Sequence, residues 1–406
     1  MKKKWLNVLL ATACLSMVAG FVGCNKTDKD TKSTVYTLNK EETAYILTEY
    51  HGADVNYTIP ATYKGLPVVE IANSAFFDCD SLEKLVIPST IKKVGNGVFG
   101  SCSNLERVDI QEGVEELGSG LFFDCDKLTS INVAENNENY QSIDGDLYSK
   151  DGKTLMQYAV GKENATLTVA ETVTKIEDFA FGGSDYLTEV VLPDTVKTLK
   201  STFYQCTELK KVTLGQSLTR IDRLTFYNCE NLTDIEIPAT VTYIGNRAFT
   251  SCLSLTEIVL PEKLKTIDES AFRMCSSLTT VKTNNGLQVI GKEAFSKCEQ
   301  LADFVIPSSV KTLDQGAFND CLNVTFYCGA ERVLDENGGV KLPSGWNLTF
   351  YRVKTDVEGN NSVNRPVYWY SENEPALNAE GTAYNGNFWR YVDDTVTPWV
   401  YAPVAA

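Results

Sequence analysis

Residues 241–261 decide the fold, and they read VTYIGNRAFTSCLSLTEIVLP. Apolar and polar side chains alternate in residues 255–260, as in a β-strand with one buried face. Pro261 ends that strand because proline cannot donate a hydrogen bond to a neighbouring strand. Residues 246–249 are expected to form a short helical turn that drives the ring of Phe249 into the core. One such unit cannot cover its own apolar face, so it requires neighbours of the same kind.

The unit recurs along most of the chain. Its phenylalanine returns after 23, 23, 59 and 22 residues, and then five times after 23. The gap of 59 residues indicates one regular coil and one longer, irregular coil. A repeat of this period predicts a solenoid whose coils stack about 4.8 Å apart, the spacing of neighbouring strands. The repeated phenylalanines are Phe76, Phe99, Phe122, Phe181, Phe203, Phe226, Phe249, Phe272, Phe295 and Phe318.

This pattern, Leu-x-x-Val/Ile-x-Ile-Pro, Val-x-x-Ile-Gly and Ala-Phe-x-x-Cys, resembles the BspA-like leucine-rich repeats of bacterial surface proteins. The resemblance covers about residues 55–328. It implies a β-rich, right-handed solenoid of 23-residue coils, each with a strand and a short helical turn, followed by a small β-rich C-terminal region. It also implies a surface-exposed, adhesive protein, because members of the family are described as binding host matrix proteins or other cells.

The chain divides into seven predicted segments. The irregular coil contains Asp151-Gly152, a strong signal for a hairpin turn. Asp144, Asp146, Ser149 and Asp151 also have a calcium-like spacing of oxygen ligands, but the hairpin is the favoured interpretation. The segments are a lipoprotein signal peptide (1–23), a tether (24–34), an N-terminal cap (35–66), repeats (67–133), the irregular coil with its hairpin (134–170), repeats (171–330) and an aromatic-rich C-terminal cap or module (331–406).

The N-terminus has the features of an export signal. Lys2, Lys3 and Lys4 precede an uncharged stretch over residues 5–20, which is too short to be a convincing membrane span. The sequence that ends at Cys24 resembles the lipobox of bacterial lipoproteins, in which cleavage occurs before a diacylated cysteine. The resemblance implies lipidation of Cys24 and anchoring at the bacterial cell surface. A plain signal peptide that is cleaved elsewhere is the alternative.

Charge and composition argue against several classes of protein. The chain has 53 acidic and 37 basic residues, a net charge of −16, whereas a nucleic-acid binder needs a basic face. His51 is the single histidine, which excludes mechanisms that need two histidines and most zinc sites. No nucleophile–base pair or carboxylate dyad stands out. We therefore expect a monomeric binding protein rather than an enzyme, with no catalytic residues, no metal and no cofactor.

Nine cysteines follow the repeated phenylalanines by three residues, and only Phe181 lacks one. Equivalent positions in stacked coils have parallel Cα–Cβ bonds, which do not suit a disulfide. We therefore expect buried, reduced thiols that act as small apolar side chains, with a redox or metal role as the alternative. Cys328 lies outside this column, and its pairing with Cys321 stays open.

The outward positions of the repeat strands are the predicted contact surface for an extracellular protein or cell-surface ligand. Basic residues occur early and acidic residues late in these positions. An ordinary solvated sheet face is the alternative interpretation. The predicted surface consists of Lys84, Arg107, Glu189, Lys211, Asp234, Glu236, Glu257, Val259, Lys282 and Asp303.

The C-terminal region offers a second candidate for binding. The repeat stops there, and aromatic residues become frequent. Exposed rings of Trp369, Trp389 and Trp399 could stack on sugar rings, which would make the region a glycan-binding module. Alternatively, these aromatic side chains form the core of a small cap that covers the end of the solenoid.

The predicted anchor can be tested at one residue. Cys24→Ser removes the sulfur that would carry the lipid, so the variant should appear in the medium instead of the membrane fraction. Membrane fractionation and mass spectrometry of the mature N-terminus provide the measurement. A wild-type N-terminus without lipid would contradict this prediction.

Overall fold

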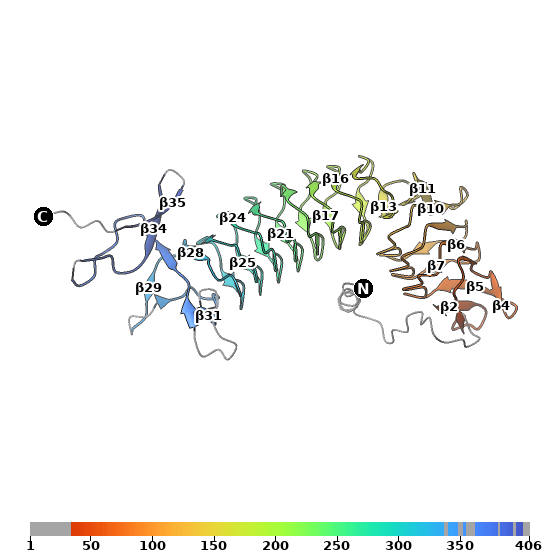
Figure 1. The fold of residues 1–406 in the computed structure, drawn as a ribbon, viewed down its shortest axis with the longest axis horizontal. Coiled ribbons are helices and arrows are strands. Elements are labelled where there is room, and N and C mark those ends of the chain that lie inside the picture. Colours follow the sequence, from red (N-terminus) through yellow and green to blue (C-terminus); the bar gives the residue numbers. More distant parts are fainter. Residues whose placement is uncertain are drawn as a thin grey trace.

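The structure is a computed structural model that describes residues 34–336, 340–347, 352–354, 362–380, 382–392 and 395–400. The predicted signal peptide and Cys24 lie outside these residues. Figure 1 shows an elongated stack of short coils, with the N-terminal strands at one end and the C-terminal strands at the other. The stack bends near the irregular coil that contains β11 (Tyr140–Ile143).

Three sheets carry the outward positions of the repeats. The N-terminal face sheet consists of β3 (Asn56–Thr58), β6 (Lys84–Ile87), β8 (Arg107–Ile110) and β10 (Ser130–Val133). The central face sheet consists of β14 (Thr166–Thr168), β16 (Glu189–Val191), β18 (Lys211–Thr213) and β20 (Asp234–Ile235). The C-terminal face sheet consists of β22 (Glu257–Val259), β24 (Thr280–Lys282), β26 (Asp303–Ile306), β28 (Thr325–Cys328), β33 (Val367–Tyr370), β34 (Phe388–Val392) and β35 (Thr395–Pro398).

The remaining strands form a second row of sheets and two hairpins. One sheet has the order β1 (Thr34–Leu38), β2 (Tyr45–Tyr50), β5 (Leu66–Ile71), β7 (Lys93–Val94) and β9 (Glu116–Leu117), with β4 (Thr62–Tyr63) paired to β5. The next joins β11 to β12 (Asp146–Ser149), β13 (Thr154–Gln157) and β15 (Lys175–Ile176). The last of this row consists of β17 (Thr198–Leu199), β19 (Arg220–Ile221), β21 (Tyr243–Ile244), β23 (Thr266–Ile267), β25 (Val289–Ile290) and β27 (Thr312–Leu313). The hairpins are β29 (Val333–Leu334) with β30 (Val340–Lys341), and β31 (Arg352–Lys354) with β32 (Ser362–Asn364).

The phenylalanine rings form a column on each side of the irregular coil. The ring centroid of Phe249 lies 5.0 Å from those of both Phe226 and Phe272, and the rings are stacked. Tyr158 fills the phenylalanine position of the irregular coil, 5.6 Å from Phe181. These buried rings confirm the predicted solenoid, in which each coil covers the apolar face of the next.

The expected helical turn before each phenylalanine is wrong, because no described residue lies in a helix. Arg247 and Ser251, two residues before and two after Phe249, have φ angles of 55° and 62°, in the left-handed region. A right-handed helix cannot contain such residues. The N–H of Phe249 instead donates to the carbonyl oxygen of Ala271 in the next coil, at 2.7 Å. Alternate N–H groups of the turn therefore bind carbonyl oxygens of the next coil, and the N–H groups between them bind carbonyl oxygens of their own coil.

The cysteine column makes a second set of bonds between coils. The Sγ of Cys252 lies 3.2 Å from the carbonyl oxygen of Phe226 in the preceding coil, and Cys275 repeats this contact with Phe249 at 3.1 Å. All ten described cysteines are buried and free, including Cys321 and Cys328. Burial raises the pKa of Cys206 to about 12, which keeps that thiol protonated and able to donate.

The irregular coil contains the predicted hairpin and one that the sequence did not identify. β12 pairs antiparallel with β13 around Asp151-Gly152, and β11 pairs with β12 around Asp144-Gly145. The carboxylate of Asp146 is buried and accepts hydrogen bonds from the Nζ of Lys162 at 2.6 Å and the N–H of Ala159 at 2.8 Å. Because the carboxylate of Asp146 already binds groups of the protein, it is not available as a calcium ligand. This favours the hairpin interpretation over the calcium alternative.

The column of rings predicts a large difference between two sites only eight residues apart. Phe249→Ala removes a fully buried ring and should cost about 3–5 kcal/mol of unfolding free energy, because stacked neighbours cannot fill the cavity. Glu257→Ala, at an exposed position of β22, should change stability by less than about 0.5 kcal/mol. Thermal melting of both variants measures the difference, and similar shifts would contradict the inward and outward assignment.

Candidate functional site

The predicted contact residues lie on the outward side of the three face sheets. In β22, Ile258 is buried whereas Glu257 and Val259 are exposed, and β18 shows the same alternation around Val212. Strand register aligns Lys84 with Arg107. It likewise forms the columns Glu189–Lys211–Asp234 and Glu257–Thr280–Asp303, and Val259 is beside Lys282. All ten predicted residues are exposed except Glu189, which is partly buried.

The outward residues do not belong to one continuous sheet. The irregular coil separates β10 from β14, and no pairing joins β20 to β22 among the described strands. β20 contains only Asp234 and Ile235, and Ile235 is partly buried, whereas its register partner Val212 and Ile258 of β22 are fully buried. The predicted surface is therefore three patches, each with its own charge pattern.

Ion pairs neutralise part of the charge of the first two patches. The guanidinium of Arg107 binds Asp109 with Nη2–Oδ1 at 2.9 Å, and the Nζ of Lys211 lies 3.1 Å from the Oδ2 of Asp234. The acceptors raise the pKa of both basic groups, which keeps both charged. Exposed pairs of this kind add little stability, but they reduce the uncompensated charge on the surface.

The C-terminal face sheet keeps its acidic charge. Neither Glu257 nor Asp303 forms an ion pair with any residue that the structure describes. Partial burial raises the pKa of Asp303. Val259 is 50% exposed, although it is a large aliphatic residue in a strand. This end of the face thus combines carboxylates with exposed apolar surface.

Two of the three tryptophans suggested for sugar stacking are buried. Trp369 is 5% exposed and joins the core, and Trp389 is 1% exposed and donates from Nε1 to the carbonyl oxygen of Cys328 at 3.0 Å. Trp399 is partly buried, and the guanidinium of Arg390 lies 3.8 Å from its ring centroid. These positions favour the capping alternative for the three indole rings.

A different set of aromatic residues lies beside the predicted contact surface. We call Tyr327, Tyr368, Tyr370, Trp389 and Tyr391 the aromatic cluster. Register aligns Tyr327 with Tyr368, and Tyr370 with Trp389, so these residues share the outward face of the C-terminal face sheet. The alternation of residues 367–370 was a signal for this arrangement, because it separates Tyr368 and Tyr370 from Trp369.

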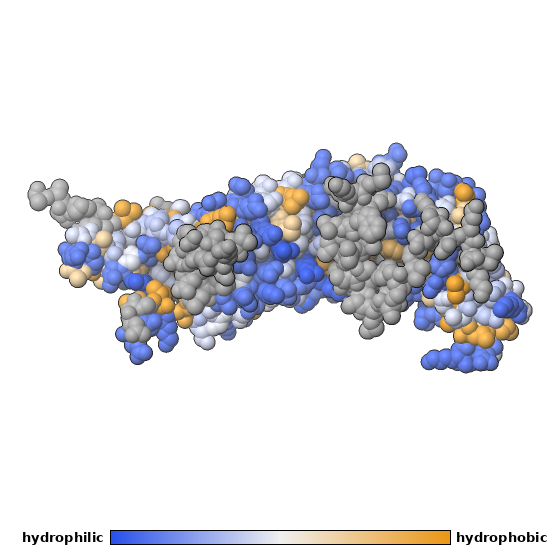
Figure 2. Space-filling model, turned by 60° about the horizontal axis from the view of Figure 1, so that its bottom comes forward, coloured by the Kyte–Doolittle hydropathy of each residue, from blue (hydrophilic) through white to orange (hydrophobic). Residues whose placement is uncertain are grey.

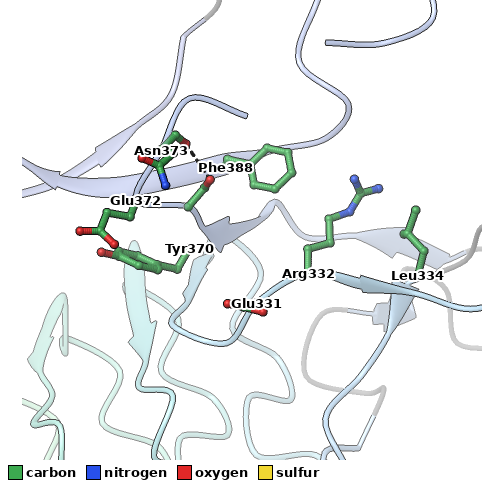
Figure 3. Close-up of a pocket in the computed structure, with 8 residues that line it drawn as sticks. Glu331, Arg332, Leu334, Tyr370, Glu372, Asn373 and Phe388 are labelled. Carbon is green, nitrogen blue, oxygen red and sulfur yellow. Dashed lines mark hydrogen bonds between the residues drawn. The ribbon is translucent and has the colours of Figure 1, made fainter. Parts of the chain in front are cut away.

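A hollow of about 420 Å³ lies next to this sheet. Figure 3 shows Tyr370, Glu372 and Asn373 on one side of it, and Arg332 and Leu334 on the other. Glu331, Ser371 and Phe388 complete its lining. The guanidinium of Arg332 donates to the carbonyl oxygen of Asn385, so this charge already has a partner. The hollow offers a mixed polar and aromatic wall without a catalytic arrangement.

Buried polar contacts join the C-terminal region to the last coils. Arg365 is 4% exposed, and its Nη2 donates to the carbonyl oxygen of Phe318 at 2.7 Å. In the repeats, the equivalent carbonyl oxygen accepts a hydrogen bond from the cysteine of the following coil, as the carbonyl of Phe249 does from Cys275. The Nε1 of Trp346 likewise donates to the carbonyl oxygen of Val310 at 3.0 Å. The region therefore continues the solenoid and terminates its ladders.

Membrane-spanning helices and metal sites are two further features of interest. No helix among the described residues is long and apolar enough to cross a membrane. The same residues contain no group of three or more histidine, cysteine, aspartate or glutamate side chains that could hold a metal ion.

Comparison with known families identifies the repeat. The model of the BspA type Leucine rich repeat region matches in six copies, over residues 58–150, 158–202 and 197–325. The chain belongs to the BspA-type leucine-rich repeat family. No curated protein matches its sequence. The family accounts for the coils, whereas the aromatic cluster lies largely beyond the matched residues.

Solved structures of bacterial leucine-rich repeat proteins resemble the chain. A leucine-rich repeat protein from Eubacterium ventriosum is 19% identical with a TM-score of 0.54, over 76% of this chain and 97% of that one. One from Bacteroides ovatus is 23% identical with a TM-score of 0.41, over 84% and 99% of the two chains. A leucine rich cell surface protein from Faecalibacterium prausnitzii is 21% identical with a TM-score of 0.38, over 74% and 88%. The first of these likenesses shows the same fold.

Arg365 provides a test of how the C-terminal region is attached. Arg365→Met keeps an unbranched side chain but removes the donor to Phe318, so the region should lose about 1.5–3 kcal/mol of local stability, the range for a bond from a charged donor. Hydrogen exchange in β33 and β34 should rise before exchange in the repeats does. Arg107→Met, in an exposed ion pair, is the control and should leave this exchange unchanged. Equal exchange in both variants would show that Arg365 does not hold the region.

Proposed function

We propose that this protein is a lipid-anchored leucine-rich repeat protein of the bacterial cell surface that binds another protein through the outward side of its face sheets. The family supports a binding role, because its members are described as adhesive surface proteins. The export signal and the cysteine at position 24 support surface anchoring. Binding rather than catalysis suits a fold that presents an extended surface of repeated units.

The observation that carries this proposal is the regular exposure of the face sheets. Stacking fixes each outward side chain beside its equivalent in the next coil, as in the column of Glu257, Thr280 and Asp303. A surface held by a rigid core loses little entropy on binding, because its strands are ordered beforehand. The side chains vary from coil to coil, whereas the core positions repeat, and this difference supplies a specific surface on a constant frame.

A glycan-binding function of the C-terminal region is the second candidate. The hollow beside Tyr370 and Phe388 has polar side chains and aromatic rings within one wall, as sugar sites do. The burial of Trp369 and Trp389 removes the broad stacking platform on which the sequence-based hypothesis depended. A glycan array probed with the mature chain separates this candidate from protein binding.

The first candidate predicts that cell binding depends on the face sheets. A variant that carries Lys211→Ala, Glu257→Ala and Asp303→Ala should bind to epithelial or bacterial cells at least about tenfold more weakly, since a few central residues dominate most interfaces. The control carries Lys93→Ala, Glu115→Ala and Glu116→Ala. It changes the net charge equally, and its residues lie in or beside β7 and β9 of the second row. Flow cytometry with the labelled protein measures binding, and equal losses in both variants would contradict the proposal.

A further inference from the structure

The aromatic cluster continues the outward face of the repeats without a break. β24 pairs with β26 at Thr280 and Asp303. Two residues after Asp303, Val305 pairs with Tyr327, and Tyr327 pairs with Tyr368. The rings of Tyr327 and Tyr368 are stacked, with centroids 5.4 Å apart. A partner that lies along β22–β28 would therefore meet the tyrosines on the same side of the sheet.

Trp389 lies at the centre of the cluster, on the same face of the sheet as the tyrosines that cover it. Its ring centroid lies 5.8 Å from that of Tyr327, 5.4 Å from Tyr370 and 4.9 Å from Tyr391, all in edge-to-face geometry. The indole is buried, whereas Tyr391 is 50% exposed and the other three tyrosines are partly exposed. The packing holds the tyrosine rings in place before any partner arrives. Rigid, partly exposed tyrosines are the residues that contribute most to protein interfaces at low entropic cost.

The surroundings of the cluster are acidic. Glu257 and Asp303, on the same sheet as the cluster, make no ion pair with any described residue. Asp303 lies close enough to Tyr327 for its charge to raise the pKa of that phenol, in addition to the larger effect of burial. Lys282 is the only basic residue among the outward positions of β22, β24, β26 and β28. Figure 2 shows hydrophobic residues among hydrophilic ones toward the C-terminal end of the molecule.

From this combination we propose that the aromatic cluster, with Glu257 and Asp303, binds a cationic segment of a partner protein. This inference rests on the proposed function, and it adds the location and the chemistry of the partner. Lysine and arginine side chains are attracted to the faces of tyrosine rings, and their charges complement unpaired carboxylates. A second copy of this chain would bring the same acidic surface against itself, so self-association at this site is disfavoured.

Selection from random peptides tests the chemistry of the partner. A phage-displayed library of short random peptides is panned against the immobilised full mature chain, and enriched peptides are then synthesised for measurements of Kd. The enriched sequences should be rich in lysine and arginine. Glu257→Gln with Asp303→Asn, and separately Tyr368→Ser with Tyr391→Ser, should each weaken binding about tenfold or more. Tyr368→Phe with Tyr391→Phe keeps both rings and should bind as wild type does.

Control variants separate this inference from the broader function. Melting temperatures close to that of the wild type show that each variant is folded. Lys84→Gln with Arg107→Gln, on the N-terminal face sheet, should leave binding unchanged. If this control alone weakens binding, the inference is wrong but face-sheet binding stands. If no face-sheet variant affects the peptides, both proposals fail. Enrichment of acidic or uncharged peptides, an absence of enrichment, or glycan binding that needs Tyr368 would overturn the cationic partner.

Discussion

Hydrogen bonds between successive coils are the constraint on which the structure depends. The turn around each phenylalanine satisfies alternate N–H groups in the next coil, as Phe249 does with Ala271. The cysteine of the next coil then satisfies the carbonyl of that phenylalanine, as Cys275 does for Phe249. A buried polar group without a partner is costly, so a coil cannot shift or change length without losing several bonds at once. The interior is therefore uniform, and variation is confined to the outside.

The hydrogen bonds between coils must be satisfied in another way at both ends of the solenoid, because the first and last coils each have only one neighbouring coil. At the C-terminal end, Arg365 donates to Phe318 in the place of a cysteine, and Trp346 donates to the carbonyl of Val310. At the N-terminal end, Tyr50 stacks on Phe76 and its N–H donates to the carbonyl of Ala75. The C-terminal region thus has a structural role that does not exclude a binding role. Its strands extend the last face sheet, and the aromatic residues that do not fill its interior remain on the outward side.

The same physical arrangement explains why the proposed binding site lies at one end of the face. Where outward charges lie opposite each other, as Lys211 and Asp234 do, the surface is already neutralised. Near Asp303 the neighbours are tyrosines, valine and threonine, which leave the carboxylate available to a partner. Three of the tyrosines there, Tyr327, Tyr370 and Tyr391, pack against Trp389. Specific recognition is strongest where surface side chains are already ordered and where their charges are not neutralised by neighbouring residues.

The sequence by itself determined the solenoid, the buried phenylalanine and cysteine columns, and the outward positions of the strands. These features follow from a period of 23 residues, because stacking places equivalent residues in equivalent surroundings. Only the tertiary structure decided which turn the phenylalanine occupies, where the face divides and which tryptophans are covered. The left-handed turn depends on bonds to the next coil, and Trp389 is buried by contacts with Tyr327 and the carbonyl of Cys328, some sixty residues earlier. Contacts between segments so distant in the chain leave no periodic signal in the sequence.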